Sequence, residues 1–62
     1  MEEFWLMDER AMDPDQFSDA TVYSVAKTLV EAREDQTEAG CGVIVRVRLL
    51  DGNEVQCVEW NV

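Results

Sequence analysis

Two apolar runs on either side of Asp51-Gly52 predict a β-hairpin near the end of the chain. Residues 41–50 and 53–60 are rich in Val, Ile and Leu, and Asp-Gly is a favoured pair for a two-residue type I′ turn. With these two residues as the loop, Val45 faces Val58 and Val43 faces Trp60. One face then carries Val43, Val45, Val47, Leu49, Val58, Trp60 and Val62, and the other carries Ile44, Arg46, Arg48, Val55, Cys57 and Glu59. An isolated hairpin is marginal in water, so we expect the remaining chain to cover the apolar face.

The alternation of residues 4–12 predicts a strand at the start of the chain. It places two large aromatic residues, Phe4 and Trp5, near the apolar face of the hairpin. Asp13-Pro14 is the clearest break in the pattern, because a proline favours an extended preceding residue and the start of a turn. We expect the strand to end before this point.

Residues 18–39 admit two interpretations. The spacing of apolar residues over 22–32 fits one long amphipathic helix with Ser18 as its N-cap. The run 21–25 is better strand material, and Thr28-Leu-Val-Glu31 is a capping box that would begin a helix at Thr28. Both interpretations place a helix at 29–38 and end it near Gly40. They predict an α+β fold, a small antiparallel sheet with one helix on its face, ordered ββαββ (slightly favoured) or βαββ, in a single domain spanning residues 1–62.

Composition and charge narrow the possible functions. The hydrophobic content of 47% is typical of a folded chain rather than a disordered acidic tail. A 62-residue domain buries only about 60% of the surface that its unfolded chain exposes, so we expect a monomer or a weak homodimer. The net charge of −9, from 14 acids against 5 bases, disfavours nucleic acid or an anionic membrane as a direct partner. A basic protein surface is the better electrostatic match.

Catalytic and metal-binding signatures are missing. The chain has no histidine, which removes the commonest general base and the Ser-His and Cys-His nucleophile arrangements. Asp13, Asp15 and Asp19 resemble a calcium loop only superficially, since the central glycine and the distal glutamate are absent. The predicted register separates Cys41 from Cys57, and the amino-terminal residues are too acidic for an export signal. We therefore expect no enzyme, no cofactor and no disulfide, in a reducing cytoplasm.

The functional prediction rests on how the acids are distributed along the chain. The first twenty residues hold seven acids and one arginine. In a helix over 29–38, four further acids recur at i, i+3, i+4 and i+7, which places them on one face. Such a stripe is most often a solvated surface; alternatively it copies the charge of nucleic-acid phosphates. The candidate partner-binding residues are Asp13, Asp15, Asp19, Glu31, Glu34, Asp35 and Glu38, whereas Trp5, Tyr23 and Trp60 are expected to be structural.

In its size, its α+β plan, its acidity and its lack of catalytic groups, the chain resembles small phage-encoded anti-CRISPR proteins of the DNA-mimic type. Those that block the DNA-recognition subunit of a type I Cascade complex are the most similar in character. The resemblance rests on size and charge over the whole chain. It implies an inhibitor in the cytoplasm of the host cell, whose seven candidate acids contact a basic effector surface.

The leading hypothesis is therefore a non-enzymatic inhibitor that binds a nucleic-acid-binding effector through an acidic, DNA-mimicking surface. The alternative is a small structural, assembly or protein–protein interaction module, dimeric through a sheet edge or exposed aromatic residues. Salt separates the two, because only the electrostatic surface loses its affinity sharply as ionic strength rises.

Overall fold

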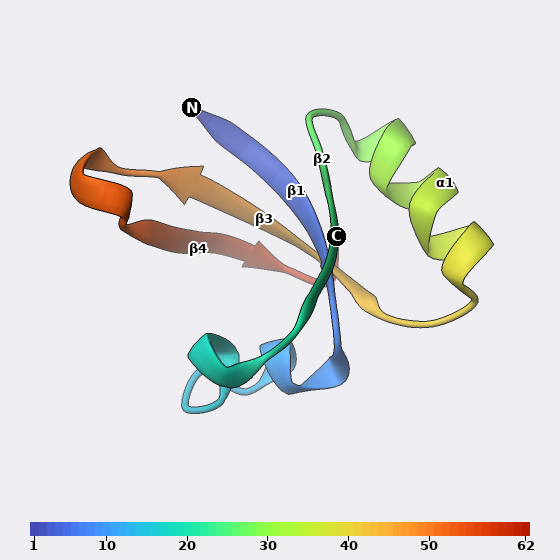
Figure 1. Cartoon of the computed structure of the whole chain (residues 1–62), viewed down its shortest axis with the longest axis horizontal. Coiled ribbons are helices and arrows are strands. Elements are labelled where there is room, and N and C mark those ends of the chain that lie inside the picture. Colours follow the sequence, from blue (N-terminus) through green and yellow to red (C-terminus); the bar gives the residue numbers. More distant parts are fainter.

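The computed structural model describes all 62 residues and shows a ββαββ chain (Figure 1). Four strands form one antiparallel sheet in the order β2-β1-β3-β4, and a single α-helix connects the second strand to the third. The elements are β1 (Glu2–Met7), β2 (Val22–Ala26), α1 (Leu29–Ala39), β3 (Val43–Leu49) and β4 (Val55–Trp60). The predicted α+β class is confirmed, and the favoured interpretation of residues 18–39 is the one observed.

Helix α1 begins and ends at the residues that the sequence indicated. The Thr28 hydroxyl accepts a hydrogen bond from the Glu31 amide at 3.2 Å, which satisfies one of the free donors of the first turn. Gly40 adopts the left-handed conformation, and its amide donates to the Gln36 carbonyl at 2.9 Å. The structure contains no helix with the length and apolar character needed to cross a membrane.

The first strand is shorter than predicted. It ends at Met7, and residues Glu9–Met12 form a 3-10 turn instead of continuing the strand. A second 3-10 turn covers Phe17–Asp19. The reason is local: the Asp8 carboxylate accepts the Arg10 amide at 2.8 Å, so Asp8 caps the turn and the chain leaves the sheet.

The β3–β4 hairpin is confirmed, but its predicted register is wrong. The loop has three residues, Asp51–Asn53, and both Gly52 and Asn53 have positive φ, at 76° and 68°. Leu49 consequently faces Val55, and a bulge at Arg46/Val47 shifts the pairing by one further residue. Val45 therefore faces Trp60, where the sequence analysis placed Val58.

The changed register moves several side chains between the faces of the sheet. Val55 and Cys57 share the face of Leu49 and Val47, against the prediction. Val62 was predicted on the face of Val47 and Leu49. It packs instead against the cluster beneath α1, and its amide donates to the Ile44 carbonyl at 3.0 Å. Trp60 stays on the face of Val45, as predicted, although its predicted partner was Val43.

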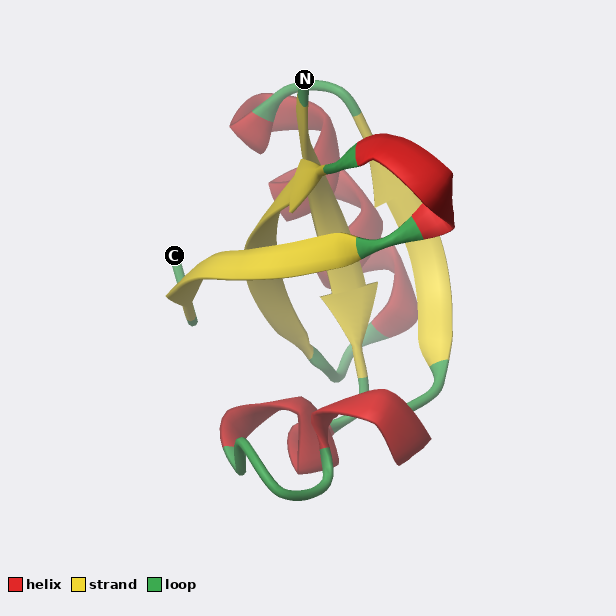
Figure 2. Cartoon of the chain, turned by 90° about the vertical axis from the view of Figure 1, so that its left-hand side faces the viewer, coloured by secondary structure: helices red, strands yellow, loops and turns green.

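Two small hydrophobic clusters lie on opposite faces of the sheet. Helix α1 covers one, and the segment containing the two 3-10 turns covers the other (Figures 1 and 2). The cluster beneath α1 consists of Leu6, Ala26, Ala32 and Ile44, and the second consists of Met7, Ala11, Val45 and Val47. The two aromatic residues predicted to meet one hairpin face are divided, with Phe4 against the first cluster and Trp5 against the second. The sheet is thus the middle layer of the molecule.

Candidate functional site: an unpaired acidic surface

Ion pairs neutralise only a small part of the acidic charge. Three arginines, Arg10, Arg46 and Arg48, pair with three acids, Asp8, Glu2 and Glu59. These six charges cancel. Eleven acids and two bases remain without an ion-pair partner, and they carry the entire net charge of −9.

The paired charges hold the strands together. The Glu2 carboxylate bonds Arg46 at 3.2 Å and Arg48 at 3.1 Å, which joins β1 to β3 across the ladder. Arg46 also reaches Glu59 of β4 at 3.1 Å. The hydrogen bond from Arg48, with further contributions from Arg46, lowers the pKa of Glu2. This network spans three strands and is occupied by its own chain, so it leaves no free charge for a partner.

Asp8 is a second structural acid. Its carboxylate accepts hydrogen bonds from the Arg10 side chain at 3.0 and 3.3 Å and from the Thr21 amide at 2.7 Å. The bond from the Arg10 side chain, followed by that from Thr21, holds the pKa of Asp8 well below its usual range. The contact joins the end of β1 to the start of β2. Sequence reasoning placed Asp8 in a strand and missed this role, although an aspartate before Glu9-Arg10 is a local N-cap signal.

Four of the seven predicted site residues lie on helix α1. Glu31, Glu34 and Glu38 are exposed, and none has an arginine or lysine within ion-pair distance. Asp35 is half-buried, and the Ser24 hydroxyl of β2 donates to its Oδ2 at 3.1 Å. The stripe predicted from the spacing is therefore present, with one member held against the sheet.

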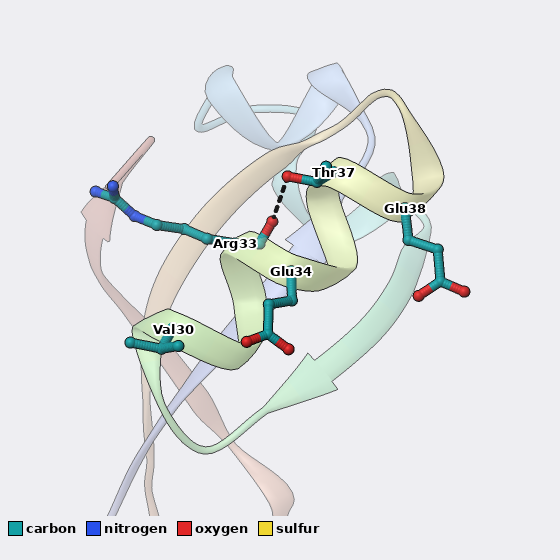
Figure 3. A pocket seen from close by; sticks show the side chains of 5 residues that line it. All are labelled: Val30, Arg33, Glu34, Thr37 and Glu38. Atoms are coloured by element: carbon teal, nitrogen blue, oxygen red, sulfur yellow. Dashed lines mark hydrogen bonds between the residues drawn. The ribbon is translucent and has the colours of Figure 1, made fainter.

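The outer side of α1 has a shallow surface furrow of about 470 Å³, lined by Val30, Arg33, Glu34, Thr37 and Glu38. Figure 3 shows the Arg33 side chain extending away from the carboxylates of Glu34 and Glu38. The Thr37 hydroxyl donates to the Arg33 carbonyl at 2.9 Å (Figure 3). Arg33 forms no ion pair, so the acids of the helix stay uncompensated.

The remaining three predicted site residues lie elsewhere. Asp13, Asp15 and Asp19 are exposed in and around the 3-10 turns. The Asp13 carboxylate accepts the Asp15 amide at 2.9 Å and the Gln16 side-chain amide at 3.1 Å, so it shapes the turn that contains Pro14. Because this segment and α1 cover opposite faces of the sheet, the seven residues form two groups, not one continuous surface (Figure 2).

Metal chemistry and relationships to other proteins add little to this picture. No three His, Cys, Asp or Glu side chains are arranged to hold a metal ion. The two thiols are free, with Cys41 exposed and Cys57 half-buried. No protein-family model, curated protein or solved structure matches the chain. The proposal for its function therefore rests on the geometry and charge of the chain itself.

Proposed function

We propose that this protein is a non-enzymatic inhibitor that binds a basic site on a nucleic-acid-binding effector and excludes the nucleic acid. The resemblance to DNA-mimicking anti-CRISPR proteins points to a CRISPR effector as the target. The observation that carries the proposal is the segregation of charge. All the paired acids stabilise the strands and the first 3-10 turn, and the whole surplus is unpaired.

Helix α1 is the main contact surface in this proposal. Its three exposed glutamates, Glu31, Glu34 and Glu38, span seven residues and therefore about 10 Å along the helix axis. Phosphates of a nucleic-acid strand are separated by distances of the same order, so a groove lined with Lys and Arg offers partners to all three. The Asp13–Asp19 segment extends the negative field from the other face of the sheet and accelerates association without direct contact.

The test is competition with DNA. A labelled duplex is bound to a purified type I Cascade complex, and to a panel of other DNA-binding proteins, and its displacement by this protein is followed by fluorescence anisotropy. We expect displacement at low salt and a sharp loss of it at high salt, because exposed ion pairs are screened. Displacement from none of the proteins would refute the function.

Charge reversal locates the surface. A variant with Glu31, Glu34 and Glu38 changed to lysine is expected to need at least about tenfold more protein for displacement. Three lost attractions of about 0.5 kcal/mol each, before any repulsion, already reach the ~1.4 kcal/mol of a tenfold change. The matched control reverses three exposed acids outside α1, Glu9, Asp51 and Glu54, and is expected to change displacement less than twofold. Equal loss in both variants would mean that net charge alone acts, and no loss in either would contradict the proposal.

A further inference from the structure

Tyr23 occupies an unusual place at the edge of the sheet. It belongs to the outer strand β2 and lies at a bulge, since Ser24 pairs with Leu6 and Val22 with Met7, which leaves Tyr23 opposite no residue of β1. The residue is 50% exposed. Tyr23 belongs to neither hydrophobic cluster. Packing in the core therefore does not account for an aromatic residue at this position.

Two surface hollows meet at this tyrosine. One, of about 340 Å³, lies between β2 and the last turns of α1 and is lined by Leu6, Tyr23, Ser24, Asp35, Glu38 and Ala39. The other is lined by Asp8, Glu9, Arg10, Tyr23, Cys41 and Gly42. The first contains carboxylates without a cation, whereas Arg10 and Asp8 already neutralise each other in the second.

The first hollow combines three features that suit one kind of ligand. Asp35 and Glu38 are three residues apart on α1, which places their β-carbons about 5–6 Å from each other. Asp35 is half-buried and uncompensated, and the hydroxyl of Ser24 fixes one of its oxygens at 3.1 Å. Its other oxygen has no hydrogen-bond or ion-pair partner within the chain. Tyr23 adds an aromatic side chain and Leu6 an apolar one to the lining of the hollow.

We propose that this hollow binds a single arginine side chain of the partner protein. The inference rests on the proposed function and specifies which side chain of the partner is bound. A guanidinium is planar, so it stacks on the ring of Tyr23 while its N–H groups donate to Asp35 and Glu38. A lysine ammonium is a compact, strongly hydrated charge and uses such a site less well. The partner therefore docks across the β2 edge and the C-terminal half of α1, with its arginine between them.

The test uses the full-length, ¹⁵N-labelled protein and two small probes, N-acetyl-arginine N′-methylamide and its lysine counterpart, at matched ionic strength. We expect saturable chemical-shift changes concentrated at Tyr23, Ser24 and Glu38, with at least about threefold tighter binding of the arginine probe. Shifts spread evenly over all exposed acids, or equal affinity for the two probes, would overturn the proposal.

Matched variants separate the hollow from general acidity. Glu38→Gln and Tyr23→Leu are each expected to weaken the arginine probe at least about threefold. Glu31→Gln makes the same charge change on the same helix outside the hollow, and is expected to stay within twofold. Equal effects of Glu31→Gln and Glu38→Gln would refute the site. Because the probes need no effector, this experiment can fail while DNA competition succeeds, or succeed while it fails, so the two proposals are tested separately.

Discussion

Gly42 gives the sharpest test of how the chain folds. It has a φ of 101°, and a β-carbon placed on it would lie 3.0 Å from both the Met7 carbonyl oxygen and Leu6 Cδ1. The Met7 carbonyl belongs to the backbone of the central strand β1, so it cannot move aside as the end of a side chain could. Replacement of Gly42 by alanine therefore introduces backbone strain and overpacking at the point where β3 joins β1.

The size of the effect follows from these two costs. An unfavourable backbone conformation costs about 1–3 kcal/mol, and overpacking adds about 1–3 kcal/mol, so Gly42→Ala is expected to lose about 2–6 kcal/mol. A 62-residue domain has roughly 3–9 kcal/mol of total stability. The variant is therefore expected to lose much of its free energy of unfolding.

Gly40→Ala is the matched control. Gly40 also has a positive φ, 75°, but a β-carbon there meets no atom within 4 Å. Its replacement carries only the left-handed penalty, about 1–2 kcal/mol. Urea unfolding followed by circular dichroism and tryptophan fluorescence measures both variants. Equal unfolding midpoints for Gly40→Ala and Gly42→Ala would refute the close contact between Gly42 and β1.

Two further predictions concern titration and thiol reactivity. The folded-state pKa of Asp8 is lowered, so its contribution to stability is complete above the unfolded value of about 3.9 and is lost as the pH falls below it. The difference in urea midpoint between wild type and Asp8→Asn should therefore shrink from pH 6 to pH 3. Glu9→Gln, at an exposed position without side-chain bonds, should show a smaller change. A constant difference for Asp8→Asn would argue against the contacts of Asp8 with Arg10 and Thr21. Burial raises the pKa of the Cys57 thiol. At pH 8 iodoacetamide should therefore modify the exposed Cys41 first, which mass spectrometry of the folded protein can follow. Equal rates of modification at the two thiols would contradict the placement of Cys57.

The features that could be predicted from the sequence are those set by neighbouring residues. The helix boundaries follow from Thr28 and Gly40, whose side chain and backbone act within one turn of the helix. The acidic stripe of α1 follows in the same way, because the spacing within a helix fixes which side chains share a face. Ala32, the one fully buried residue of α1, belongs to the run 22–32 whose apolar spacing indicated a helix.

The hairpin shows where local signals become insufficient. The Asp51-Gly52 pair predicts a two-residue loop, whereas the loop has three residues, Asp51–Asn53, and the extra residue shifts the register by one. The bulge at Arg46/Val47 adds a second shift that no turn signal encodes. Its position depends on how β4 closes over the sheet and how Val62 returns to Ile44, which are tertiary contacts.

In the candidate site, too, the local pattern was predictable and the tertiary arrangement was not. The grouping of Glu31, Glu34, Asp35 and Glu38 was predictable, but the separation of Asp13–Asp19 from them was not. It depends on which face of the sheet each segment covers, and therefore on the strand order. Tyr23 was predicted to be structural, and the structure instead leaves it half exposed at a bulge.

The position of Glu38 connects the fold to the proposed contact. An acid in the first turn of a helix, such as Glu31, is favoured by the helix dipole, whereas an acid near the last turn is disfavoured by about 0.3–1 kcal/mol. The last turn of α1 contains no basic residue to offset Glu38, and Arg33 points away from it. The helix thus carries a charge that weakens it, next to the half-buried Asp35 and the exposed Tyr23. Local violations of folding rules concentrate at functional sites. Glu38 is such a violation, and the arginine that we propose for the hollow would offset its unfavourable position at the end of the helix.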